Sequence, residues 1–389
     1  MPELFWLLLP VAAASGWFIG RRERGRRGAA GAELPQDYFK GLNYLISEQP
    51  DKAIEVFTRL VEVDSETVET HLALGNLFRR RGEVDRAIRI HQNLIARPSL
   101  DRELRAQALL ELGMDYMRAG LLDRAESLFE QVVEFGAHAE AALRQLLIIY
   151  QQEQDWQKAI SVALRLESRT GAAAATRVPV AQFYCEQAEL ARERGEWAGA
   201  RHLLRRALAH DPDCARASIL LGDLEHAHGN TKAALKAYQR VQVQNIDFLP
   251  EVLLPIRDCY RELGQSAAML RYLYDILDQY GGPAPMLMLS DLLCEQQGTE
   301  AAIEFTAEQL RRKPSVLGLH RLIQLTIGSV DEASRPGVAV LDQALEQLLR
   351  DRPGYECRQC GFGAKALYWQ CPSCKSWATV KPVQGIKGE

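Results

Sequence analysis

The chain has 389 residues, of which 47% are hydrophobic and 25% charged, and its formal net charge at pH 7 is -4. These values are ordinary for a folded protein and exclude a disordered or collagen-like chain. The charge is uneven, because residues 1–27 carry five arginines against two glutamates and residues 350–389 carry seven basic residues against three acidic ones. The middle of the chain is therefore strongly acidic, which argues against a general nucleic-acid-binding protein.

The N-terminus is predicted to be a membrane anchor over residues 1–20, followed by a basic linker at 21–34. The stretch Leu4–Gly20 has no charged residue in its seventeen positions, and as a helix it would span about 26 Å. Trp6 and Trp17 lie near its ends, where interfacial aromatic residues are common, and Arg21 and Arg22 follow it. The positive-inside rule then predicts a single-pass membrane protein with its body in the cytoplasm. A cleaved signal peptide that ends near the alanines at 12–14 is the alternative.

Residues 35–350 repeat at a period of 34 residues. In the second repeat Gly75, Phe78, Ala87 and His91 follow one another at intervals of three, nine and four, and the same phase continues through about nine segments. The small residue lets a second helix approach closely, an aromatic one turn later fills the gap, and the alanine marks the next crossing. The pattern resembles the tetratricopeptide family, which predicts an all-α superhelix of about nine helix–turn–helix repeats.

Two interruptions break this period. The interval lengthens to 38 residues near Pro98 and to 41 residues between the fourth and fifth repeats, where Thr170 and Gly171 precede the alanine run 172–175. Insertions in a repeat array change its curvature or form a bulge on one face. The second interruption is interpreted either as a hinge or as a helical extension, since alanine is the best helix former.

A partner groove is predicted on the inner face of the array. In tetratricopeptide arrays this face is lined three and six residues before the small residue of each repeat, and one and four residues after it. That register selects seven residues of the second to fourth repeats as the predicted groove: Leu72, Asn76, Arg79, Leu110, Met114, Met117 and Ile148. It also selects Tyr38, Leu42, Leu45, Arg144 and Gln151. Because most of these side chains are apolar, the groove favours an apolar peptide or partner helix over an acidic tail. The alternative is that they pack against neighbouring helices in a tightly wound superhelix.

Residues 351–389 are predicted to form a small metal-binding domain and tail. Cys357 and Cys360 form one C-x2-C pair, and Cys371 and Cys374 form a second pair ten residues later. Two thiolates separated by two residues can hold one ion from a single tight turn, and two such turns complete a tetrahedral site of four sulfurs. One structural zinc ion is preferred, and an iron site that carries single electrons is the alternative.

The surroundings of these cysteines add two expectations. Aromatic residues flank them, and so much apolar surface on a hairpin of this size predicts docking on the last repeats or on a partner. Nucleic-acid binding through nearby lysines is a further option, which the acidic body disfavours. The other cysteines are interpreted as packing residues or bystanders: Cys185, Cys214, Cys259 and Cys294.

No catalytic signature is found, and the chain is predicted not to be an enzyme. The sequence contains no phosphate-binding G-x-x-x-x-G-K-[ST] loop, no H-E-x-x-H and no G-x-S-x-G. A repeat array of this kind typically binds other proteins.

The combination of an N-terminal anchor, about nine repeats and a terminal four-cysteine knuckle resembles the lipopolysaccharide assembly protein B family over the whole chain. The resemblance implies a non-enzymatic adaptor of the bacterial inner membrane. Its implied partners are a membrane-bound AAA+ protease, the deacetylase that commits carbon to lipid A, and the inner-membrane lipopolysaccharide sensor and transport proteins. A homodimer is left open.

Overall fold

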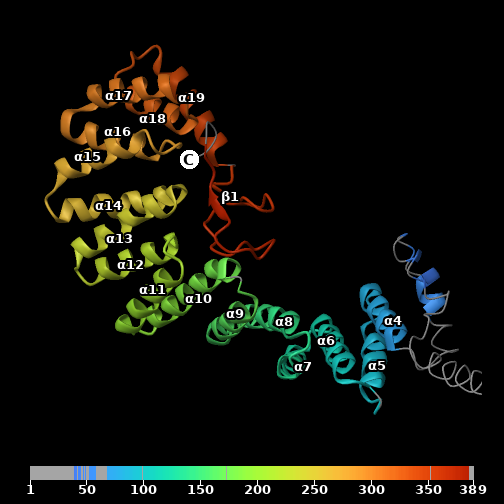
Figure 1. Ribbon diagram of the computed structural model, residues 1–389. Helices are drawn as coiled ribbons and strands as arrows, with labels where there is room; N and C mark the ends of the chain where they lie inside the picture. The colour runs from blue at the N-terminus through green and yellow to red at the C-terminus, as the bar shows by residue number, and fades with distance from the viewer. Residues whose placement is uncertain are drawn as a thin grey trace, which may run out of the picture. The chain divides into compact units, whose positions relative to one another are not determined.

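Figure 1 shows the computed structural model, which describes residues 39–41, 43, 44, 47, 49, 52–57, 68–98, 100–171, 173–350 and 352–384. The predicted anchor, the basic linker and the residues Trp6, Trp17, Arg21 and Arg22 lie outside this range. Within the described part of the chain, no helix is long and apolar enough to cross a membrane.

Helices dominate the described residues and follow one another in pairs. Each pair forms one repeat, and eight complete pairs lie between residues 68 and 350. They are α4 (Val68–Arg81), α5 (Val84–Ile95), α6 (Arg102–Arg118), α7 (Leu122–Phe135), α8 (Ala139–Gln152), α9 (Trp156–Thr170), α10 (Ala173–Glu193), α11 (Trp197–His210), α12 (Ala215–Ala227), α13 (Thr231–Gln244), α14 (Leu249–Glu262), α15 (Ser266–Leu277), α16 (Ala284–Gln297), α17 (Thr299–Arg312), α18 (Val316–Thr326) and α19 (Arg335–Arg350), with the 3-10 helix η2 (Ile246–Phe248) before α14.

In four of the predicted repeats, the small residue is a glycine that faces the ring of the second helix. A Cβ atom at Gly113 in α6 would lie 2.5 Å from a ring carbon of Phe129 in α7, too close for any side chain. A Cβ atom at Gly222 would likewise lie 2.4 Å from a ring carbon of Tyr238. Glycine is therefore required here because two helices approach closely, and the ring of the second helix fills the space above its backbone. The same pairing is found at Gly41 with Phe57 and at Gly75 with His91.

The long interval between the fourth and fifth repeats is a helical extension. Helix α9 ends at Thr170, Gly171 follows in the left-handed conformation with φ of 66°, and α10 begins at Ala173. The alanine run therefore lengthens the start of α10, which has 21 residues, as alanine's helix propensity favours. The shorter interruption contains the start of α6, where the Asp101 side chain accepts a hydrogen bond from the Leu104 backbone N–H and caps the helix.

The chain divides into two compact units, Met1–Ile149 and Tyr150–Glu389. In the first unit, a buried polar network replaces the usual aromatic contact of the second repeat. His91 Nδ1 lies 2.5 Å from Asp115 Oδ2, and Arg79 pairs with Asp115 at 2.8 Å and with Glu111 at 2.6 Å. His91 and Asp115 are fully buried. Buried polar groups of this kind need such partners, because each loses its hydration.

The second unit contains the helices from α9 onward and a C-terminal three-stranded antiparallel sheet of order β2-β1-β3. Its strands are β1 (Tyr355–Cys357), β2 (Gly363–Ala364) and β3 (Val380–Pro382). Tyr355 pairs with Ala364 on one side, and Cys357 pairs with Val380 on the other. We call residues 352–384 the ribbon. The prediction of a mostly helical repeat array with a small metal-binding domain at its C-terminal end is confirmed for the described residues.

Candidate functional site

The ribbon brings together the four cysteines that the spacing singled out. Cys357 ends β1, and its carbonyl accepts a hydrogen bond from the Gly361 N–H at 2.9 Å. The second pair repeats this turn, because the Cys371 carbonyl accepts from the Lys375 N–H at 2.9 Å. Gly361 and Lys375 both have positive φ, of 75° and 59°. The two C-x2-C segments therefore form matching knuckles that present their sulfurs to a common point.

The sulfur positions fit one tetrahedral ion. All four Sγ atoms lie within 4.8 Å of one another. The Sγ atoms of Cys357 and Cys374 are 3.7 Å apart, as are those of Cys360 and Cys371. A tetrahedron with metal–sulfur bonds of about 2.3 Å has sulfur–sulfur edges of about 3.8 Å. The donor set therefore fits zinc, and it fits iron equally well because both accept four thiolates.

The surroundings of the thiols favour the metal-binding thiolate form at one knuckle. Burial opposes ionisation of Cys357, but its hydrogen bond with the Thr379 hydroxyl and those with backbone N–H groups outweigh burial and lower the pKa of this thiol to about 6. Thr379 Oγ1 lies 3.3 Å from Cys357 Sγ. The thiolate is the form that binds metal. Cys357 and Cys371 are buried, whereas Cys360 is exposed, so the centre lies at the surface of the ribbon.

The second knuckle is anchored to the helices by a tryptophan on its C-terminal side. Trp377 follows Cys374 by three residues, and its indole Nε1 donates a hydrogen bond to Gln151 Oε1 at 2.9 Å. Its ring packs edge-on against Trp156 of α9 and Phe183 of α10, with centroid distances of 6.0 Å and 5.8 Å. Such aromatic pairs stabilise by about 0.5–1.5 kcal/mol each beyond the area they bury.

A second tryptophan anchors the N-terminal side of the same knuckle. Trp369 precedes Cys371 by two residues and lies 5.0 Å from the Phe248 ring, and the Arg216 guanidinium lies 5.7 Å from its ring centroid. Arg216 itself is almost fully buried and pairs with Glu186 at 2.8 Å and with Glu189. Because a buried guanidinium needs compensation, the two carboxylates and the tryptophan face together make this burial tolerable.

Polar contacts complete the docking at the other end of the ribbon. The Tyr355 hydroxyl donates to Glu251 Oε1 of α14 at 2.7 Å. Lys381 of β3 forms an ion pair with Asp247 of η2 at 2.6 Å, and Gln384 donates to the same carboxylate at 2.9 Å. The ribbon therefore contacts helices from the fourth to the seventh repeat.

These contacts fall on inner-face positions of the repeats. Gln151 was selected by the groove register, and Arg216 lies six residues before Gly222 in the same register. Glu251 occupies the equivalent place in the seventh repeat, nine residues before Tyr260. The inner face of these repeats is therefore occupied by the chain's own ribbon. The ribbon docks on the repeat array, as its aromatic surface predicted, but its aromatic and ionic partners lie on α9, α10, η2 and α14 and not on the last repeats.

The predicted groove residues of the first unit have mixed surroundings. Leu72 is buried and packs with Leu94, Leu100 and Ala108, as the packing alternative expects. Half-buried side chains stand at five of the other positions, Asn76, Arg79, Leu110, Met114 and Met117, and Ile148 is 47% exposed. Leu110, Met114 and Met117 follow one another at helical spacing along α6 and retain accessible surface. The groove therefore stays a prediction for these three residues, for Ile148, and for Asn76 and Arg79.

Several residues of the site had weaker signals in the sequence. Trp369 and Trp377 stood out as excess aromatic surface beside the cysteines, but nothing in the repeat period identifies Gln151, Arg216 or Glu251 as their partners. The register of the repeats places all three on the inner face, but it does not indicate what covers them. The pairing across 226 residues between Trp377 and Gln151 has no local signature.

Comparison with known proteins agrees with this architecture. Residues 355–382 match the family model described as a rubredoxin metal-binding domain, and residues 70–106 and 185–247 match tetratricopeptide-repeat models. The chain also resembles a solved tetratricopeptide-repeat protein from Parabacteroides merdae, with 13% identity, coverage of 75% of this chain and all of that one, and a TM-score of 0.35.

Two curated relatives match over nearly the whole chain. Lipopolysaccharide assembly protein B of Escherichia coli K12 is 42% identical over 390 residues and covers 100% of both chains. The Haemophilus influenzae protein of the same name is 37% identical and covers 98% of both chains. Identity and coverage of this extent, together with the repeat and metal-binding models that match this chain, show that this protein is a tetratricopeptide scaffold and belongs to the lipopolysaccharide assembly protein B family.

Proposed function

We propose that this chain is a non-enzymatic adaptor that regulates lipopolysaccharide synthesis. In this proposal it presents the deacetylase that commits carbon to lipid A to a membrane-bound AAA+ protease for degradation. The full-length relatives whose name refers to lipopolysaccharide assembly support the pathway. The repeat array supports a binding role, because stacked helical repeats expose extended surfaces that recognise other proteins.

The observation that carries the proposal is the difference in how the inner positions are covered. In the second unit the ribbon lies on them, through Trp377 on Gln151 and Trp369 on Arg216. In the first unit, Leu110, Met114 and Met117 keep accessible surface. Methionine and leucine at helical spacing suit an apolar peptide or helix, because their flexible side chains adapt to the partner. We assign substrate capture to this surface.

The predicted anchor gives the proposal its location. A single span at residues 1–20, with Trp6, Trp17, Arg21 and Arg22 at its boundaries, would confine the adaptor to the membrane plane of the protease. Confinement raises the effective concentration of substrate and protease without any additional contact. The lipopolysaccharide sensor and transport proteins of the inner membrane would then reach the same cytoplasmic body.

The test is a triple substitution of Leu110, Met114 and Met117 by alanine. The variant is expected to weaken binding of the deacetylase by about tenfold or more, since several apolar anchors are truncated together. The half-life of the deacetylase in cells should lengthen accordingly. A matched control replaces Val340, Leu341 and Leu348 of α19, which are also exposed and apolar, and should leave binding unchanged. If the folded triple variant binds the deacetylase normally and the half-life of the deacetylase is unchanged, capture at this surface is excluded.

A second candidate is electron transfer by an iron-loaded ribbon. The sulfur geometry favours it as much as zinc, because an S4 site accommodates both metals. Protein purified under anaerobic conditions separates the two candidates. Stoichiometric zinc supports the structural role, whereas stoichiometric iron with a reversible visible spectrum would replace the adaptor proposal with the electron carrier.

A further inference from the structure

Two neighbouring helices of the second unit have an unusual charge. Helices α11 and α13 are the second helices of the fifth and sixth repeats, and neither contains an aspartate or glutamate. In the range 84–350, the second helix of each of the remaining repeats contains at least one aspartate or glutamate. The basic residues of the pair are Arg201, Arg205, Arg206, Lys232, Lys236 and Arg240. The guanidinium of Arg206 lies 4.6 Å from the Tyr184 ring centroid and lines a different pocket. We call the other five residues the basic face; it lies within a chain whose net charge is -4.

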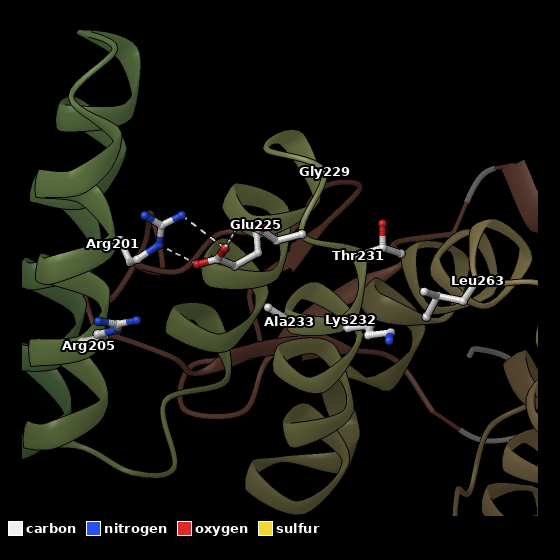
Figure 2. Close-up of a pocket in the computed structure, with 9 residues that line it drawn as sticks. Arg201, Arg205, Glu225, Gly229, Thr231, Lys232, Ala233 and Leu263 are labelled. Carbon is white, nitrogen blue, oxygen red and sulfur yellow. Dashed lines mark hydrogen bonds and ion pairs between the residues drawn. The ribbon is translucent and has the colours of Figure 1, made fainter.

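An open pocket of about 850 Å³ lies within the basic face. Figure 2 shows Arg201 and Arg205 on one side, carried by α11, and Thr231 and Lys232 at the start of α13 on the other. A volume of this size can admit a peptide side chain together with its backbone, since ligand pockets typically measure about 300–1,000 Å³.

The carboxylate inside the pocket is already neutralised. Arg201 donates two hydrogen bonds to Glu225, at 2.5 Å and 3.1 Å, and the Asn230 side-chain amide donates a third at 2.8 Å. These hydrogen bonds, Arg201's foremost, lower the pKa of Glu225. Glu225 therefore stays ionised and paired at neutral pH, and it offers little repulsion to a second carboxylate beside it.

The remaining cations of the pocket are available. Arg205 and Lys232 are exposed, and neither makes a hydrogen bond or ion pair with any residue in the part of the chain that the structure describes. Lys236 and Arg240 continue the positive charge along α13 and are exposed as well. A ligand with several negative charges would thus meet two exposed cations that have no hydrogen bond or ion pair to break on binding.

We propose that the basic face around this pocket is a docking site for an acidic peptide segment of a partner protein, with carboxylates of the segment seated between Arg205 and Lys232. The hollow shape favours a peptide over a membrane, because a bilayer surface is broad and nearly flat and would leave the pocket empty. The strongly acidic middle of the chain disfavours a nucleic acid. This site is separate from the predicted groove on α6 and does not depend on the adaptor proposal.

The test uses the full chain in a nonionic detergent and a fluorescein-labelled deca-glutamate peptide, with binding followed by fluorescence anisotropy. The double variant Arg205→Glu and Lys232→Glu is expected to weaken binding about tenfold, because it reverses two cations that face the peptide. Raising the salt from about 50 mM to about 300 mM should weaken binding to the original chain, since charge contacts at an exposed site are screened. The melting temperature should not change, because both side chains are exposed and unpaired.

The matched control reverses two exposed cations outside the basic face, Arg169→Glu and Arg335→Glu. It changes the net charge equally and should alter peptide binding less than about twofold. A milder pair, Arg205→Gln and Lys232→Gln, covers the case in which charge reversal disturbs folding.

Four outcomes would overturn the proposal. Undiminished peptide binding by the folded Arg205 and Lys232 variants would exclude these two residues, and equal loss in the control would show a dependence on net charge alone. Phosphatidylglycerol vesicles form a separate arm. If the variants lose vesicle binding while deca-glutamate binding persists, the basic face is a membrane contact. Displacement of the peptide by micromolar inorganic phosphate would instead assign the pocket to a small anion.

Discussion

The two units use the same repeat in different ways. In the second unit, inner positions such as Gln151, Arg216 and Glu251 are polar and are covered by the chain's own ribbon. In the first unit, α6 carries Leu110, Met114 and Met117 on the inner face, of which only Met117 is equivalent to Gln151 in the register, and all three keep accessible surface. The repeat period does not reveal this difference, since a glycine and the ring that faces it recur in both units, as Gly113 with Phe129 and Gly222 with Tyr238. What separates the units is the chemistry of the inner face.

The difference indicates that the inner face binds a fixed partner in the second unit and an exchangeable partner in the first. A polar inner face with a buried arginine needs a fixed partner, because an unpaired buried charge is costly. Glu186 and Glu189 form ion pairs with Arg216, and Trp369 of the ribbon covers its guanidinium. An apolar face that is only half buried tolerates an exchangeable partner, because water can cover it when the partner leaves. We therefore expect perturbations of the ribbon to act on the second unit and to leave the first unit folded.

The largest effect is expected from Cys371→Ser, which removes one of four thiolates. Structural zinc sites contribute about 10–16 kcal/mol of folding free energy in small domains, so loss of the ion should unfold the ribbon and release both tryptophans from the helices. We expect loss of bound metal, a red shift of tryptophan emission, and faster hydrogen exchange in α9, α10 and α14. Exchange in α4 to α7 should be unchanged.

The matched control is Cys294→Ser, which alters a half-buried thiol of α16 outside the four-cysteine cluster. It should retain the metal and the emission spectrum. If Cys371→Ser also kept a full complement of metal and a docked ribbon, the ion would have no part in covering the inner face. If exchange rose in α4 to α7 as well, the two units would not be independent.

Whether a contact could be predicted from the sequence depends on how far apart its residues lie along the chain. The knuckles of Cys357 and Cys371 were predictable, because each depends on residues within three or four positions along the chain. The contact of Gly113 with Phe129 was predictable too, since sixteen residues separate them in every repeat of this kind. The hydrogen bond from Trp377 to Gln151 was not predictable, because these side chains meet only after the intervening helices have folded. The same holds for the replacement of a ring contact by His91 and Asp115.

A smaller effect is expected from Trp377→Ala, which leaves all four cysteines in place. Truncation of a packed tryptophan costs about 3–5 kcal/mol, and here it removes the contacts with Trp156 and Phe183 and the hydrogen bond to Gln151. The ribbon should still bind one metal ion but should dock more weakly. Hydrogen exchange in α9 and α10 would therefore rise without loss of metal.

Tyr368→Ala provides the comparison for this variant. Tyr368 belongs to the same ribbon but is 44% exposed, so its truncation should leave exchange in α9 and α10 unchanged. Equal exchange rates in Trp377→Ala and Tyr368→Ala would mean that the ribbon is held mainly by its contacts with η2 and α14.

The smallest effect on stability is expected from glycine-to-alanine substitutions where the two helices of a repeat approach closely, which occurs in both units. Gly113→Ala places a methyl group 2.5 Å from a ring carbon of Phe129 in the first unit, and Gly222→Ala does the same 2.4 Å from Tyr238 in the second. Overpacking of this kind costs about 1–3 kcal/mol, which outweighs the helix propensity of about 1 kcal/mol that alanine gains over glycine. Gly199→Ala, whose nearest contact would be 3.8 Å away, should gain that propensity and raise stability slightly.

In chemical denaturation followed by hydrogen exchange, Gly113→Ala should destabilise α6 and α7 alone. Gly222→Ala should destabilise α12 and α13 and, because Arg216 of α12 supports Trp369, should also loosen the ribbon. A ribbon that loosened equally in both variants would show that its docking responds to the whole array and not to the inner face beneath it.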